Sequence, residues 1–424
     1  MRSFAPALFP LSALLALAAC ASDAAPAPVA APPATTPAPS PSPSEPTGPA
    51  APVSCDAASD GAAGCSPAPA VAVAPPPPLR IRFLGVDGFL IEAGDDAVLS
   101  APLFTRPSMI EASTGIPITS DATLVASRLP SSALAHVSAV LAGHAHYDHL
   151  LDVPAVLGLA PSATLYSNVS ARNVLAAYAP DRAAKCAGTS APSTPIARSR
   201  VVAVDDPAAS TVDYTNCPEK RPAGAPMQGT WIKVPGAHVR VLAVCSDHPD
   251  QIGPIHYGAG DVDDEQCTPP TNMNDWREGR TVAYLVDFLD PKTDAPIYRV
   301  FYQDAPADTP VGHVPAAFLA DKRVDVALMC VGTYDHVDDA SPAKALTALG
   351  PRFALGGHWE DFFGSLDDAP QPIPFLDVAA WATKAVAVLP ALVGTAPMLR
   401  NGAPAAERAL LPQPGDTFEI APAL

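Results

Sequence analysis

Three histidines and an aspartate stand within six consecutive residues, as His144, His146, Asp148 and His149. Imidazole and carboxylate groups bind divalent metal ions, and four of them at this density indicate a metal site. On an extended segment residues i and i+2 point to the same side, so His144 and His146 can bind one ion. Asp148 and His149 follow a turn and can face a second ion roughly 3.5 to 4 Å away, close enough for two metals to share a hydroxide. The run predicts the start of a two-metal centre.

The segments on either side explain how this run is positioned. Residues 137–142 are apolar and predict a buried strand, while the residues after Leu151 predict a helix. The four side chains therefore occupy a corner between a strand and a helix, where rigid elements commonly hold catalytic groups.

The pattern His144-x-His146-x-Asp148-His149 resembles the signature of the metallo-β-lactamase-fold hydrolases. Its version here, His-Ala-His-Tyr-Asp-His-Leu-Leu-Asp, is most similar to the branch that contains ascorbate-6-phosphate lactonase and N-acyl-phosphatidylethanolamine phospholipase D. The resemblance implies an α/β fold built as a four-layer αββα sandwich. It also implies hydrolysis assisted by two divalent ions, zinc by default, although manganese or iron suits the same ligands.

The resemblance extends to later ligands. His248 follows an apolar strand at residues 237–245, as the family's third-motif histidine does, and is expected to complete the first ion's ligands. His256 is its rival, and His238, at the start of the strand, is less favoured. Asp304, at the end of a β-rich run, resembles the bridging aspartate. His358, after a glycine pair, resembles the closing ligand and is expected to bind the second ion with Asp148 and His149.

A second aspartate matches the family's Gly-Asp tripeptide better than Asp304 does. Gly415-Asp416-Thr417 contains it, but this tripeptide follows the final ligand along the chain, and that order excludes it. Two supporting positions depart from the family pattern. Ala101 stands where an Asp-Pro turn is usual, which removes a carboxylate near the metals, and Gln303 replaces the glycine before the bridging aspartate.

Two residues are candidates for catalytic roles beyond metal binding. Asp148 would help to orient the shared hydroxide. His336 follows a later strand, where the lactonase and phospholipase branch places residues that contact the substrate. It could donate a proton to the leaving group, or equally be a solvated loop histidine.

The N-terminal part of the chain predicts export. Residues 1–20 resemble a bacterial lipoprotein signal peptide, with Cys20 as the lipidated residue that would anchor the protein in the cell envelope, at the outer membrane. An ordinary cleaved signal is the alternative. Residues 21–78 are rich in proline and alanine and predict a disordered tether. Residues 79–424 are long enough for one large domain, the expected hydrolase domain.

Charge and cysteine content limit the class of partner and the cellular compartment that fit this chain. A formal charge of −18, from 25 basic and 43 acidic residues, argues against a nucleic acid as partner and leaves a small-molecule or lipid-like substrate. The oligomeric state stays open. Cysteine usage fits an oxidising compartment, with Cys330 as a buried free thiol in an apolar strand. The pairs expected from sequence proximity are Cys55 with Cys65, Cys186 with Cys217, and Cys245 with Cys267.

Three functions remain open from the sequence. The first is an envelope hydrolase of an ester, lactone or phosphodiester, the second is a β-lactamase, and the third is a non-catalytic metal-binding surface lipoprotein. A complete set of seven candidate ligands favours catalysis. Two insertions, 185–220 and 249–277, would determine the substrate, and the acidic second one predicts a lid or pocket wall beside the metals that disfavours highly anionic substrates.

Overall fold

A computed structural model describes residues 75–423, apart from 101, 191–192, 207–228, 309–310, 338–340 and 392–395. The chain divides into two compact units, residues 1–72 and 73–424, and every described element belongs to the second. The predicted signal peptide, most of the tether and the proposed Cys55–Cys65 pair lie outside the described residues, as do Cys217 and Ala101.

The first sheet has the strand order β14-β13-β16-β1-β2-β3-β4-β5-β6. Strands β1 to β3 form an antiparallel meander, and β3 to β6 run parallel. Side chains alternate between the faces, so that Phe89 and Ile91 pack on one side and Leu90 on the other. The strands are β1 (Leu79–Gly85), β2 (Gly88–Ala93), β3 (Asp96–Ser100), β4 (Val137–Leu141), β5 (Thr164–Ser167), β6 (Val201–Ala203), β13 (Leu399–Arg400), β14 (Ala403–Pro404) and β16 (Thr417–Ile420).

The second sheet has the order β15-β12-β11-β10-β9-β8-β7. Strands β15, β12, β11 and β10 run parallel to one another, and β10, β9, β8 and β7 pair antiparallel. The strands are β7 (Ile232–Lys233), β8 (Val239–Cys245), β9 (Val282–Leu289), β10 (Pro296–Gln303), β11 (Val326–Cys330), β12 (Phe353–Gly357) and β15 (Ala409–Leu410).

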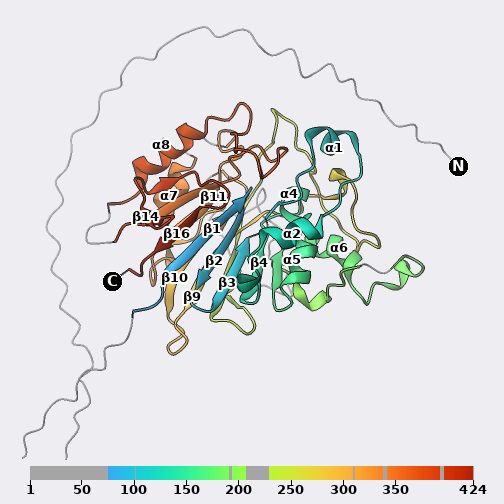
Figure 1. Cartoon of the computed structure of the whole chain (residues 1–424), viewed down its shortest axis with the longest axis horizontal. Coiled ribbons are helices and arrows are strands. Elements are labelled where there is room, and N and C mark those ends of the chain that lie inside the picture. Colours follow the sequence, from blue (N-terminus) through green and yellow to red (C-terminus); the bar gives the residue numbers. More distant parts are fainter. Residues whose placement is uncertain are drawn as a thin grey trace, which may run out of the picture. The chain divides into compact units, whose positions relative to one another are not determined.

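Helices cover the outer faces of the two sheets, as Figure 1 shows. One core contains the facing side chains of both sheets and extends to Leu346 and Trp381 of α7 and α8, while a second core joins the first sheet to α2, α3, α5 and α6. The four-layer αββα arrangement expected from the sequence is confirmed. The helices are α1 (Met109–Thr114), α2 (Ala122–Arg128), α3 (Ser131–Leu134), α4 (Tyr147–Leu150), α5 (Val153–Leu159), α6 (Val169–Leu175), α7 (Ala343–Leu349) and α8 (Val378–Val388). Among the described helices, none has the length and apolarity that crossing a bilayer requires.

A disulfide joins the two insertions and corrects the expected pairing. Cys186 is bonded to Cys267, 81 residues away, so the predicted Cys186–Cys217 and Cys245–Cys267 bonds are wrong. Cys245 is also disulfide-bonded. Proximity along the chain failed as a guide because the two insertions meet in space. The expectation that Cys330 is a buried free thiol is confirmed.

Candidate metal centre

The predicted ligands follow the carboxyl ends of four strands drawn from both sheets. His144 follows β4, His248 follows β8, Asp304 follows β10 and His358 follows β12. These four strand ends meet at one edge of the sandwich, where the described ligand atoms form contiguous groups. The fold therefore gathers residues that lie more than 200 positions apart in the sequence.

One group consists of His144, His146 and His248, whose candidate ligand nitrogens all lie within 4.8 Å of one another. Their ring centroids are 4.6 Å (His144 to His146), 4.8 Å (His144 to His248) and 5.1 Å (His146 to His248) apart. Burial lowers the pKa of all three rings. For His144 and His146 the neighbouring imidazoles lower the pKa further. Each ring is therefore neutral at pH 7 and offers a nitrogen lone pair to a metal ion.

A second group surrounds Asp148. Its Oδ2 atom lies 3.0 Å from His358 Nε2 and 3.3 Å from His149 Nε2. Burial alone would raise the pKa of Asp148, but the two imidazoles outweigh it and hold that pKa well below its usual value. Asp148 is therefore a carboxylate at neutral pH, as a metal ligand or an acceptor for a water proton must be.

Asp304 stands between the two groups. Its Oδ1 atom lies 3.1 Å from His144 Nδ1, and its Oδ2 atom lies 3.8 Å from His149 Nδ1. The Gly143 N–H donates to Oδ2 at 2.5 Å. A Cβ atom on residue 143 would lie 2.1 Å from Oδ1, so only glycine fits at this approach. Candidate ligand atoms of Asp304, His144 and His149 therefore form a further group within 4.8 Å of one another.

Gln303, which departs from the family pattern, fastens the bridging loop to the opposite strand end. Its buried side chain donates from Nε2 to Ser246 Oγ at 3.2 Å. Ser246 lies just after β8 and two residues before His248. The amide thus links the loop that carries Asp304 to the loop that carries His248.

His256, the rival for the third ligand, binds other partners. Its Nε2 atom is hydrogen-bonded to Glu278 and its Nδ1 atom lies 3.3 Å from Asp250. The buried Glu278 was not anticipated from the sequence, because it belongs to no motif and simply precedes β9. Glu278, His256 and His146 form a further group of candidate ligand atoms within 4.8 Å of one another. The pair therefore lies directly beside the first metal group.

The other sequence candidates lie elsewhere. His336 Nδ1 contacts the Asp250 carbonyl oxygen at 2.6 Å and belongs to none of the ligand groups formed by described residues. The side chain of Asp416 is bound by Arg400, Asn401 and the Gln413 N–H, which makes it a structural residue of the C-terminal turn.

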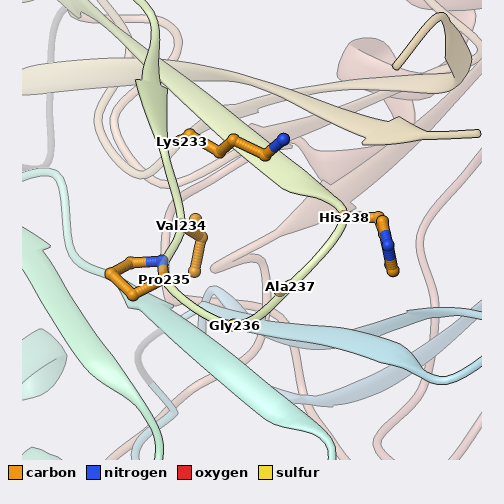
Figure 2. A pocket seen from close by; sticks show the side chains of 6 residues that line it. All are labelled: Lys233, Val234, Pro235, Gly236, Ala237 and His238. Atoms are coloured by element: carbon orange, nitrogen blue, oxygen red, sulfur yellow. The ribbon is translucent and has the colours of Figure 1, made fainter. Parts of the chain in front are cut away.

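His238 lies at the far end of β8 from His248. Seven strand residues separate them, and at about 3.3 Å per residue this strand spans roughly 23 Å. A pocket of about 400 Å³ lies at the β7–β8 turn, between Lys233 and His238 (Figure 2). Lys233 and His238 pair with Asp294 and Asp96 respectively, so this pocket has no connection to the candidate ligands.

No family model and no curated protein matches the chain. Among solved structures, the chain is similar to the metallo-beta-lactamase fold protein YhfI from Bacillus subtilis, at 11% identity over 81% of this chain and 99% of that one, with a TM-score of 0.37. It is similar to Igni18, a metallo hydrolase from Ignicoccus hospitalis, at 12% identity over 80% and 97%, with a TM-score of 0.39. A third is isothiocyanate hydrolase from Delia radicum gut bacteria, at 10% identity over 81% and 99%, with a TM-score of 0.37. At such identities the likeness concerns the fold at most, and the chemistry rests on this chain's own residues.

The donor set fits divalent metal ions. His144 Nε2, His146 Nε2, His149 Nδ1 and His358 Nδ1 are buried and have no hydrogen-bond partner. Burying polar atoms without partners is unfavourable, and metal coordination would satisfy them. Asp148, whose pKa the neighbouring imidazoles lower, supplies negative charge, and Asp304, whose pKa burial raises, supplies further oxygen donors. Histidine nitrogens with carboxylate oxygens suit zinc, and also manganese or iron.

Proposed function

We propose that this protein is a metal-dependent hydrolase that binds two divalent ions and cleaves an ester, lactone or phosphodiester. The observation that carries the proposal is the convergence of predicted ligands from four strand ends: candidate ligand atoms of six of them lie in shared groups, and the seventh, Asp148, lies within 3.3 Å of two of these six. When bound, two such ions lower the pKa of a shared water to about 7 and polarise the oxygen under attack. The protein's own residues supply the positioning.

Each group of side chains has a distinct part. His144, His146 and His248 would hold one ion, and Asp148, His149 and His358 the other. Asp304 would bridge them, since its two oxygens face His144 and His149. Asp148, which stays ionised at neutral pH, would also accept a hydrogen bond from the attacking water and so orient it.

The 249–277 insertion supports a small substrate with an apolar part. A Cβ atom on Gly258 would lie 2.9 Å from the His146 ring, so the insertion touches a predicted ligand. Within the same insertion, just before Gly258, Ile252, Ile255 and Tyr257 are 57%, 47% and 43% exposed. Exposed apolar side chains at the rim of a polar site favour contact with an acyl or lipid-like group.

Export to the cell envelope, with a lipid on Cys20, belongs to the same proposal. The Cys186–Cys267 disulfide supports it, because disulfides persist in oxidising compartments and are rare in the cytosol. Labelling with a radioactive fatty acid, compared between the wild type and Cys20→Ala, tests the anchor. Equal labelling of both proteins would contradict it.

Metal analysis of the purified protein tests the function. We expect about two transition-metal ions per chain in the wild type, and fewer in His146→Ala and Asp304→Ala. His238→Ala is the matched control, because this histidine lies at the opposite end of β8 and its loss leaves the metal content unchanged. A metal-free wild type would refute the proposal. Screening acyl esters, lactones, phosphodiesters and nitrocefin then identifies the substrate class, and nitrocefin turnover alone would make the protein a β-lactamase.

A further inference from the structure

Asp87 is a buried acid that the sequence analysis did not single out. It lies in the turn between β1 and β2, and its side chain is fully buried. Neither carboxylate oxygen has a hydrogen-bond partner among nitrogen and oxygen donors of the described residues. Its neighbour Cys330 offers only a thiol, which is a weak donor. A carboxylate so placed is strongly unfavourable unless a cation or a proton neutralises it.

Two predicted metal ligands stand next to this carboxylate. Candidate ligand atoms of Asp87, His149 and His358 all lie within 4.8 Å of one another. This spacing allows three donors, each about 2.0 to 2.2 Å from a central ion, to share that ion. The Nδ1 atoms of both histidines are buried and lack hydrogen-bond partners, like the oxygens of Asp87.

From this arrangement we propose that Asp87 is a ligand of the second metal ion, together with the Nδ1 atoms of His149 and His358. Asp148 Oδ2, which lies at the Nε2 atoms of both rings, would then orient these rings rather than bind the same ion. The family pattern has an aspartate where this chain has Ala101. Asp87, from the β1–β2 turn, would supply a carboxylate in its place. The inference rests on the proposed function, because it assumes that the second ion binds. It adds an oxygen donor to that site alone, so the second ion would have an oxygen-richer set of ligands than the first. Oxygen donors favour manganese and iron relative to zinc.

The backbone around Asp87 is fastened to the segment that carries His358. The His358 N–H donates to the Val86 carbonyl oxygen at 2.6 Å, and the Val86 N–H donates to Glu360 Oε1 at 2.6 Å. Glu360 is in turn paired with Arg106 at 2.9 Å, and both side chains are buried. The two ligand-bearing segments are therefore held as one unit.

This connection maintains two unfavourable backbone conformations. Val86 has φ +51° and His358 has φ +52°, in the left-handed region that a β-branched valine rarely adopts. Such conformations persist where the surroundings enforce them, and they cluster at ligand sites. The strain therefore coincides with the two positions that aim Asp87 and His358 at the same point.

Space for the carboxylate depends on a glycine. A Cβ atom on Gly357 would lie 2.0 Å from Asp87 Oδ1, so any side chain at residue 357 would displace the acid. Ser100 Oγ accepts from the Phe89 N–H at 2.7 Å and donates to the Asp87 carbonyl oxygen. The turn is thus positioned from β3, and its acid has room only because residue 357 has no side chain.

The test compares Asp87→Asn with the wild type, using full-length protein, metal analysis and thermal unfolding with and without chelator. The variant keeps the shape of the side chain and removes its charge. We expect its metal content to fall from about two ions to one per chain. We also expect its affinity for manganese, relative to its affinity for zinc, to fall at least tenfold. Asp205→Asn is the control, since Asp205 is buried with an unpartnered oxygen but belongs to none of the ligand groups. Its metal content should not change.

The unfolding temperature separates a ligand from a structural acid. In metal-loaded protein Asp87→Asn should lower the unfolding temperature, because a ligand is lost. After chelation the same change should raise it, because the neutral amide replaces an unpartnered buried acid that is either charged or forced to bind a proton. Asp87→Ser should reproduce this reversal of sign. A decrease of equal size in both states, or an unchanged metal content, would overturn the ligand role, whereas a wild type without two ions would refute the proposed function itself.

Discussion

Replacing Gly143 with alanine would test how the bridging carboxylate is positioned. The added Cβ atom would lie 2.1 Å from Asp304 Oδ1 and 2.5 Å from the Val282 carbonyl oxygen, whereas real Cβ contacts are essentially never under 3.0 Å. The Val282 carbonyl would also have to shift, by about 0.5 Å, although the Val282 N–H ties this strand to the Gly143 carbonyl oxygen at 2.8 Å. The Asp304 carboxylate must therefore retreat by about 0.9 Å, the difference between 2.1 and 3.0 Å.

A displacement of this size removes a metal ligand. Metal–ligand distances hold within about 0.2 Å, so a shift of about 0.9 Å breaks the contact to at least one ion. A misplacement of about 1 Å in a catalytic site lowers the rate roughly 100-fold, equivalent to about 2.7 kcal/mol of transition-state stabilisation. We expect Gly143→Ala to lose about 100-fold in kcat/KM and about one of two ions.

The assay is metal analysis together with hydrolysis of the best substrate found in the screen. Gly364→Ala is the matched control, because a Cβ atom there would meet nothing closer than 3.8 Å. Neither glycine has a positive φ, so backbone strain does not separate the two variants. If Gly143→Ala kept the metal content of the wild type and a rate within about twofold of it, the reasoning would be refuted. The close approach of Asp304 to Gly143 would then not determine where the metal ions bind.

Three further predictions concern stability. Arg299→Met should destabilise the protein by about 3 kcal/mol in urea unfolding, because it leaves the fully buried Asp287 with only its bonds from Arg240; a loss below about 1 kcal/mol would contradict this. The double change Cys186→Ser and Cys267→Ser should cost roughly 2 to 4 kcal/mol without altering metal content, since the bond closes a long loop; metal loss would show that the insertions support the centre. Burial raises the pKa of Asp416, but hydrogen bonds, chiefly from the Gln413 N–H and the Arg400 side chain, outweigh it and lower the pKa below its usual value. The stabilising carboxylate is then fully present above the unfolded pKa of about 3.9 and is lost as the pH falls through the lower folded value. Asp416→Asn should therefore be less stable than the wild type at pH 7, with a difference that narrows below about pH 4, and a gap independent of pH would count against it.

Local patterns determined a large part of the site. The run from His144 to His149 indicated metal binding because its ligands are neighbours in the chain, and i, i+2 geometry places two of them together whatever the rest of the fold does. The resemblance to family motifs that follow strands predicted His248, Asp304 and His358 as further ligands. The apolar run at residues 137–142 likewise predicted a buried strand, and all five residues of β4 (Val137–Leu141) are buried.

Contacts between distant segments were decided only by the tertiary structure. Cys186 pairs with Cys267 rather than with the nearer Cys217, because the two insertions meet in space. Asp87 lies beside His358, although 271 residues separate them, because β1 and β12 end at the same edge of the sandwich. Such contacts depend on how the two sheets stack and on where glycines allow other groups to approach the backbone closely. Neither property is encoded by the spacing of residues within one segment.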